Sequence, residues 1–394
     1  MPPRFKLGIY VVEGLNTFAC AYYGNYLLFL LRDHHGFGNV HNLALGACHG
    51  LMYVVSSLYG GRFGQRHGYF TSLRVGFAGM ALAMIAALLV PQLPGQLLAF
   101  AAWTLSMCFT WPSLEALVSE HEPPAALPHR LGLYNLVWAS ISAVAYFVGG
   151  TLFETLGAAS LYWLPAALYA TNFAATFVLS RAHDAWLARN GTHVSTQPTT
   201  PRTDPAAKPR YFLKLAWLGN PFAYMAINTF TAVVPGIAKN VGLSISEAGM
   251  VMSVWFIVRA MSFVVLWGWH GWHYRFRWFI SAFVLLLASF VTAMLAREVW
   301  LLVVAQIFFG WATGVAYYSS LFYAMDGSDT KGEHGGAHEA FIGAGICAGP
   351  AVGAASLWLA PAAPAAPAWA VGTLLLAGLA SVIGVRLKVR EKVR

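Results

Sequence analysis

Glutamates stand inside two long apolar segments of this 394-residue sequence. Glu13 lies in YVVEGLNTFACAYYGNY, and Asn16 is three residues on, so both side chains share one face of a helix. Glu115 lies in TWPSLEALVSE, three residues after Pro112, which can break or kink a helix. An ionisable group at membrane depth is costly, and it either marks a solute or proton pathway or pairs structurally. Both interpretations stay open for Glu13, and Glu115 has the alternative of reaching the membrane interface.

Arg259, in MSVWFIVRAMSFVV, is a basic residue deep within an apolar segment. It requires a carboxylate, an anionic substrate or a cavity there, so we interpret it as a substrate residue, with a structural ion pair as the alternative. His338 and Glu339 open a later apolar segment and suggest a gate or proton relay, because histidine titrates near neutral pH. His334 precedes them, but the order lacks a metal-binding helix motif, and we predict no metal site.

Uncharged polar and aromatic side chains in other apolar segments form a second group of candidates. An isolated polar residue on a membrane helix more often makes an interhelical hydrogen bond than contacts a solute. The polar candidates for a substrate pathway are Asn135, Asn228 and Gln306, and the aromatic candidates for a cavity lining are Trp111, Trp138, Trp255 and Trp311.

The segments that hold these residues are long and apolar enough to cross a membrane. Hydrophobic residues make up 58% of the chain and charged residues 10%, against about 25% charged in soluble domains. Apolar runs of about 20 residues, the length that spans a bilayer, recur throughout. The first run lacks a convincing cleavage site and is interpreted as a retained helix. We predict an all-α membrane protein with spans near 7–31, 39–60, 70–90, 95–118, 132–155, 160–180, 213–238, 244–268, 277–296, 299–325, 337–359 and 366–387.

The basic residues predict the orientation of these spans. With both termini inside, 20 of the 24 lysines and arginines fall on the inner side, Arg32, Lys239 and Arg297 fall outside, and Arg259 lies within a span. Lysine and arginine favour the cytoplasmic side, so we expect cytoplasmic termini and the inner membrane of a bacterium. The formal net charge of +9 is thus a topology signal, and no nucleic-acid partner is expected.

A polar stretch, 181–212, separates the sixth span from the seventh. It contains THVSTQPTTPRTDPAAKPR, which is rich in Thr, Pro and charge and has no apolar periodicity, as in a flexible linker. We therefore expect a six-helix bundle over 1–180, a cytoplasmic linker over 181–212 and a second six-helix bundle over 213–394.

The architecture resembles the major facilitator superfamily of secondary transporters over essentially the whole chain. In that family the loop after the second helix carries Gly-x-x-x-Asp-Arg-x-Gly followed by two basic residues. In GGRFGQRHGYF the matching positions are Gly61, Gln65, Arg66 and Gly68, and Gln65 replaces the acid. The resemblance implies that this loop gates the cytoplasmic side, and the alternative is that its arginines are topology anchors.

The resemblance and the buried charges together predict transport of a small polar or anionic organic solute, coupled to protons, by alternating access of two bundles. No phosphate-binding loop, nucleophile or cofactor motif is found, so we expect neither an enzyme nor a cofactor. Besides the solute and protons, the expected partner is the lipid bilayer, and the protein is expected to work as a monomer. One alternative is efflux of amphipathic compounds, which the lack of arginine in the fourth span disfavours. Another is a receptor or scaffold that does not transport.

Overall fold

The computed structural model describes residues 3–123, 126–191, 207–327 and 331–393. Within these ranges the regular structure is entirely helical, and each of the twelve predicted spans is confirmed as a helix or a broken helix. The helices are α1 (Pro3–His35), α2 (Asn39–His67), α3 (Tyr69–Leu89), α4 (Leu93–Met107), α5 (Trp111–Ser119), α6 (Leu127–Leu156), α7 (Ser160–Asn190), α8 (Ala207–Val241), α9 (Ile245–Gly268), the short 3-10 helix η1 (His270–Trp272), α10 (Phe276–Leu295), α11 (Val299–Gly327), α12 (Lys331–Leu359) and α13 (Ala366–Val393).

Ten of these spans are long and apolar enough to cross a membrane, with α4 and α5 counted as one span. The helices α1 and α7 fall outside that set because polar and tyrosine side chains lower their hydropathy. Both still belong to the bundle, since α1 packs against α6 and α7, and α7 packs along α3. The chain is therefore an integral multi-pass membrane protein.

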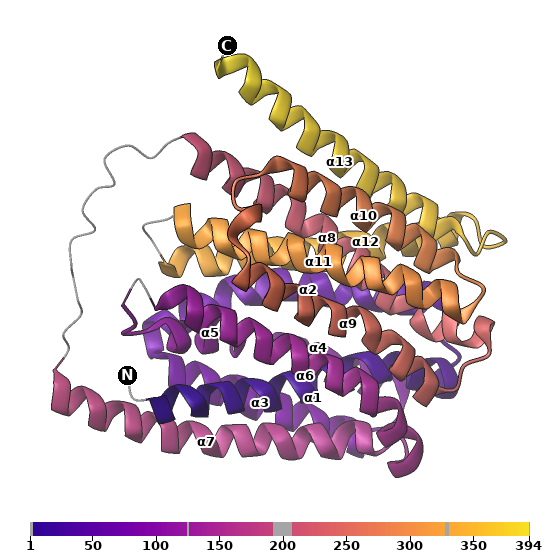
Figure 1. Ribbon diagram of the computed structural model, residues 1–394. Coiled ribbons are helices and arrows are strands. Elements are labelled where there is room, and N and C mark those ends of the chain that lie inside the picture. The colour runs from indigo at the N-terminus through magenta and orange to yellow at the C-terminus, as the bar shows by residue number, and fades with distance from the viewer. Residues whose placement is uncertain (1–2, 124–125, 192–206, 328–330, 394) are drawn as a thin grey trace.

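The helices lie side by side across the molecule (Figure 1). We call the end at which α7 stops, at Asn190, and α8 begins, at Ala207, the linker end; α1 also begins there. Helix thus occupies both flanks of the predicted linker 181–212, and residues 192–206 lie outside the described part of the chain. The most extensive contacts between the first six spans and the last six join α2 to α12 and α6 to α9. The two-bundle division stays a prediction.

The fourth span is broken, as Pro112 predicts. Helix α4 ends at Met107 and α5 begins at Trp111, with Pro112 in the first turn of α5. Proline lacks the N–H that would continue the ladder of hydrogen bonds, so it is tolerated at a helix start and not within a helix. Glu115 lies on α5, directly after this break.

The glycine-rich segment after the second span is mostly helix rather than loop. Helix α2 continues to His67, and Gly68 alone separates it from α3, at φ +89°. Only glycine adopts that backbone readily, which explains the residue type at this position. The predicted loop, which begins at Gly61, is therefore too long, because the chain stays helical to His67. Gln65 and Arg66 are exposed and have no side-chain partner among the described residues.

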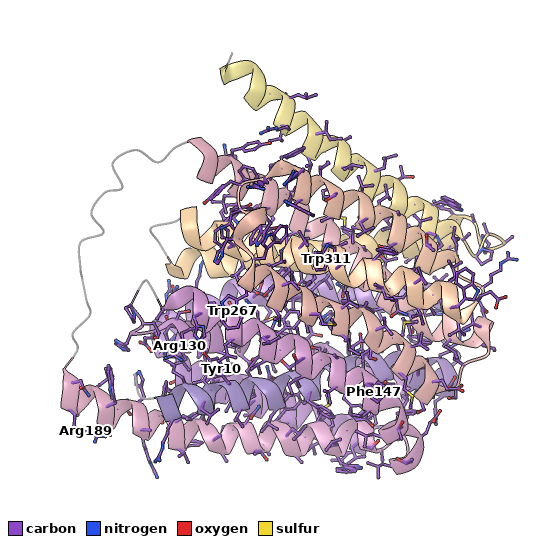
Figure 2. All side chains as sticks on the ribbon, viewed as in Figure 1. Tyr10, Arg130, Phe147, Arg189, Trp267 and Trp311 are labelled. Atoms are coloured by element: carbon purple, nitrogen blue, oxygen red, sulfur yellow. The ribbon has the colours of Figure 1, made fainter. Side chains whose placement is uncertain are left out.

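Residues from the two predicted bundles meet at both ends of the molecule. At the linker end the His129 ring lies 5.0 Å from that of Trp267, and Figure 2 places Trp267 near Tyr10 and Arg130. At the opposite end the hydroxyls of Thr151 and Ser246 share a hydrogen bond of 2.6 Å between α6 and α9. The two predicted bundles are therefore in contact toward each end of the helices.

Candidate functional site

A cavity of about 250 Å³ lies in the centre of the molecule. Helices from both predicted bundles line it, so it sits at the interface that alternating access would open and close. Three of the tryptophans expected in the lining, Trp111, Trp138 and Trp255, are there. Trp311 is not, and instead packs against a separate apolar cluster around Leu215. The site residues that line the cavity are Tyr53, Glu115, Tyr224, Asn228, Arg259, Tyr317 and Glu339.

Arg259 is the most unusual group in this cavity. It is 2% exposed, and it forms no ion pair within the described part of the chain. Its guanidinium carbon lies 4.7 Å from the centre of the Trp138 ring and 5.0 Å from that of Tyr317. Aromatic faces attract a cation, but they leave its N–H groups free. The Nε and Nη2 atoms have no hydrogen-bond partner among the described residues. The structure therefore offers no described carboxylate for the structural ion pair considered from sequence.

Glu115 and Glu339 reach the same cavity from α5 and α12. The Tyr53 hydroxyl donates a hydrogen bond of 2.5 Å to Glu339 Oε2, which joins α2 to α12 across the molecule. Glu115 lines the cavity, so it does not lie solely at the membrane interface. The predicted partner of Glu339, His338, falls in the part of α12 whose side chains are not described.

Glu13 and Asn16 lie one layer behind the cavity wall and are fully buried. Glu13 Oε1 accepts hydrogen bonds from Thr17 at 2.8 Å and from Trp111 Nε1 at 3.3 Å, and both donors line the cavity. Its second oxygen, Oε2, has no partner in the described structure. Asn16 accepts a weak bond of 3.7 Å from the thiol of Cys20. Glu13 is thus linked to the cavity through two of its lining residues.

The three uncharged polar candidates, Asn135, Asn228 and Gln306, differ in how they lie relative to the cavity. Asn228 lines the cavity and donates to the Tyr224 carbonyl at 2.9 Å. Asn135 is buried beside it and accepts a bond of 3.4 Å from the Tyr317 hydroxyl. Gln306 is fully buried outside the lining, and neither polar atom of its side chain has a partner in the described ranges. Of these three residues, Gln306 is therefore the one that is separate from the site.

Sequence reasoning missed the tyrosines that join the two predicted bundles. Tyr53 reaches Glu339, and Tyr317 stacks under Arg259 while bonding Asn135. Tyrosine is also the usual residue of the membrane interface belt, so its type alone does not separate the two roles. A helical projection of α2 is the signal that could have placed Tyr53 on the face of His49, which lines the same cavity.

The sequence matches the family model of the Major Facilitator Superfamily over residues 9–219. The chain belongs to the Major Facilitator Superfamily. A search of the curated proteins found no match. The resemblance predicted from the twelve spans and the glycine-rich motif is therefore confirmed at the level of the family.

Solved structures share the fold at low identity. A bacterial homologue of the human lysosomal transporter Spinster, inward-facing and occupied, is 14% identical with a TM-score of 0.65, covering 96% of this chain and 94% of that one. The human organic anion transporter MFSD10 (TETRAN) is 16% identical at 0.65, covering 96% and 100%. A structure from the proton dependent oligopeptide transporters is 12% identical at 0.70, covering 99% and 100%. At such identities the likeness shows the fold alone.

Proposed function

We propose that the protein is a secondary transporter that moves a small organic anion together with a proton. The cavity takes the solute, and the two predicted six-helix bundles rock about it so that access alternates between the two sides. In this proposal the termini and the linker 181–212 face the cytoplasm of a bacterium, and one chain is the working unit. The basic residues gathered toward the linker end favour that orientation.

The buried guanidinium of Arg259, which has no carboxylate partner among the described residues, carries the proposal. A buried cation without a counter-charge is strongly unfavourable, and a bound anion would supply the missing charge and hydrogen bonds. The aromatic rings of Trp138 and Tyr317 hold the guanidinium in place and leave its Nε and Nη2 atoms without a hydrogen-bond partner among the described residues. A carboxylate can accept two parallel bonds from one guanidinium, so an organic carboxylate fits best.

Proton coupling rests on the bond between Tyr53 and Glu339. An ionised carboxylate accepts a phenolic hydrogen bond more strongly than a neutral one does. Because the two residues belong to α2 and α12, the protonation state of Glu339 would alter a contact between the two predicted bundles. Glu115 lies in the same cavity as a further acid that can hold a proton.

Flux into proteoliposomes tests the proposal. The purified protein is reconstituted, candidate carboxylates are first screened by thermal shift, and uptake of a stabilising solute is measured with and without an imposed pH gradient. We expect saturable uptake that accelerates with an inward proton gradient and collapses when a protonophore is added. Saturable uptake that ignores the gradient would contradict proton coupling, and binding without flux would favour a receptor.

The aromatic lining favours efflux of amphipathic compounds as a second candidate. Trp103, Trp111, Trp138 and Trp255 all face the cavity and give it broad apolar surfaces. A drug-sensitivity panel in an expressing strain separates the two. Resistance to several unrelated cations would support efflux, since Arg259 should repel a cation, whereas an unchanged panel leaves the anion proposal in place.

A further inference from the structure

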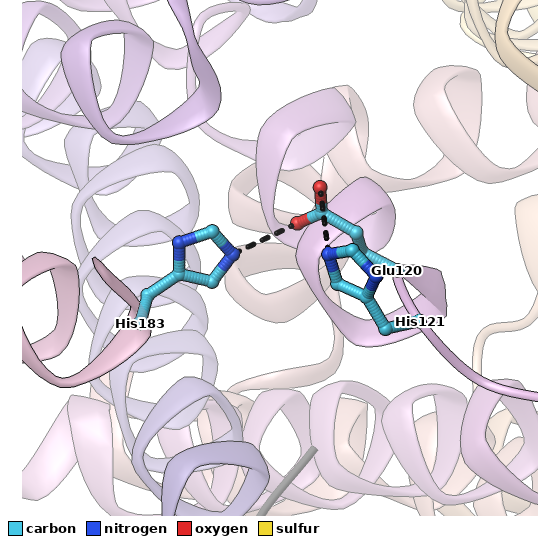
Figure 3. Close-up of side chains that lie close together, drawn as sticks. All are labelled: Glu120, His121 and His183. Atoms are coloured by element: carbon cyan, nitrogen blue, oxygen red, sulfur yellow. Dashed lines mark ion pairs between the residues drawn. The ribbon is translucent and has the colours of Figure 1, made fainter. Parts of the chain in front are cut away.

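Glu120, His121 and His183 converge at the linker end, and none of them lines the central cavity. Glu120 and His121 directly follow α5, and His183 comes from α7 (Figure 3). His121 Nε2 lies 3.6 Å from Glu120 Oε1, and His183 Nε2 lies 3.4 Å from Glu120 Oε2. One ligand atom from each of the three residues lies within 4.8 Å of the other two. The transport site uses none of these residues.

The backbone at Glu120 is fixed by hydrogen bonds from Lys6. Its ammonium donates to the carbonyls of Leu117, Val118 and Glu120 at 2.8 to 2.9 Å, which caps the C-terminus of α5. A cation at this end of a helix also interacts favourably with the helix dipole. Glu122 balances the charge of Lys6 at 3.4 Å. The position of Glu120 is thereby fixed by contacts that do not use its carboxylate.

His121 adopts a backbone conformation that is rare for its type. Its φ is +57°, in the left-handed region, where a residue with a side chain persists only if its surroundings enforce it. The turn directs the ring of His121 back toward the carboxylate of its neighbour, Glu120 (Figure 3). His183 is set by apolar contacts, with its ring centre 5.7 Å from that of Phe5 and 5.6 Å from that of Phe70.

We propose that these three residues form a binding site for a zinc-class transition metal ion. Zinc takes imidazole nitrogen and carboxylate oxygen at about 2.0–2.2 Å in a tetrahedron, which puts neighbouring ligand atoms about 3.3–3.6 Å apart. Each histidine lies at about that distance from one oxygen of the Glu120 carboxylate, His121 from Oε1 and His183 from Oε2, and one ligand atom from each residue lies within 4.8 Å of the others. The facing atoms, Glu120 Oε2 and His183 Nε2, are both buried and have no hydrogen-bond partner in the described ranges. Three protein ligands leave the fourth position to water.

A second acidic side chain contacts His183 on the nitrogen that does not face Glu120. Asp184 Oδ1 lies 3.6 Å from His183 Nδ1, and a carboxylate on the far nitrogen of a metal-binding imidazole orients the ring and raises its basicity. The other charged groups that face the cluster are Lys6, Glu122 and Arg130, and Glu122 contacts both cations. A bound ion would tie the segment after α5 to α7 and so stiffen the linker end.

Metal titration of the full-length protein in nanodiscs tests the site. After treatment with a chelator, the protein is titrated with ZnCl₂ by calorimetry, and with CoCl₂, whose visible absorption reports four-coordinate geometry. We expect one ion per chain, and a loss of about 10-fold or more in affinity for each of Glu120→Gln, His121→Ala and His183→Gln. The glutamine at 183 keeps side-chain bulk against Phe5 and Phe70, so the fold is retained. His67→Ala, an exposed histidine of α2, is the matched control and should bind as the unaltered chain does.

Two outcomes would overturn the proposal. In one, the unaltered chain shows no saturable binding beyond that of the His121→Ala and His183→Gln double variant. In the other, no metal binds and the protein becomes more stable as the pH falls through the histidine range, as expected if Glu120 pairs only with protonated histidine. A metal site gives the opposite trend: the metal ligands must be deprotonated, so metal affinity decreases as the pH is lowered.

Discussion

The guanidinium of Arg259, which has no carboxylate partner among the described residues, gives the sharpest prediction for a single residue. Removal of one partner of a buried, hydrogen-bonded charge pair costs about 2 kcal/mol or more, so Arg259→Gln should weaken binding of the transported anion at least ~30-fold. Arg259→Lys keeps the charge but loses the planar pair of donors, and should fall between. Calorimetry with the identified solute measures both. Equal affinity in all three proteins would remove Arg259 from the substrate site.

Tyr53→Phe removes only the hydroxyl that binds Glu339 and keeps the ring that lines the cavity. If this bond couples protonation to rocking, the variant should bind the solute with near-normal affinity but lose most of the acceleration by a proton gradient. The comparison of binding with gradient-driven uptake separates coupling from affinity. Tyr59→Phe, an exposed tyrosine on the same helix, is the control. A Tyr53→Phe protein with full acceleration would refute the role.

The charged residues of the site were found from sequence because their type is improbable in a membrane. Arg259 and Glu115 stood out because a charge in an apolar run needs a cause. Tyr53 did not, since tyrosine is common in such helices. The cluster of Glu120, His121 and His183 escaped for another reason: about 60 residues separate two of its members, and only the packing of α7 against the end of α5 brings them together.

At the scale of elements, α2 and α12 cross at a glycine. A methyl group on Gly50 would collide with the backbone at Cys347 of α12, whereas one on Gly61, further along α2, would meet nothing within 4 Å. Gly50→Ala should therefore force the helices apart and lower the melting temperature and transport. Gly61→Ala should leave transport unchanged. Its free energy of unfolding should stay the same or rise by up to ~1 kcal/mol, because alanine favours helix.

Thermal unfolding in detergent measures this pair on one helix. A Gly50→Ala protein as stable as the Gly61→Ala protein would show that the close crossing is not needed. The elements themselves were largely readable from sequence, because apolar length gave the spans and Pro112 gave the break before α5. The end of α2 was not, since glycine and arginine suggest a loop while the backbone remains helical to His67.

At the scale of the whole molecule, rocking requires the contact between α6 and α9 to open. Thr151→Cys with Ser246→Cys replaces a hydroxyl pair 2.6 Å apart with two thiols that can be joined by a disulfide. Oxidation should then abolish transport, and a reductant should restore it. Each single variant controls for the native cysteines, including the exposed Cys48. Undiminished transport by the fully cross-linked protein would contradict rocking at this end.

The number of spans was predictable for the whole chain because each one needs its own apolar run. Contacts between distant spans were not predictable in the same way. The pairing of Tyr53 with Glu339 and that of Arg259 with Trp138 follow from the crossing of α2 with α12 and of α6 with α9, which no local pattern encodes.

The presence of Arg259 and Glu339 in one cavity has an electrical consequence. If one anion neutralises Arg259 and one proton neutralises Glu339 in each turnover, the pair that crosses the membrane carries no net charge. A single charge would exchange about 2.3 kcal/mol with a membrane potential of 100 mV, but a neutral pair exchanges none. Uptake driven by a pH difference should then be the same with and without a potassium diffusion potential, so that the cell's voltage neither drives nor resists this carrier.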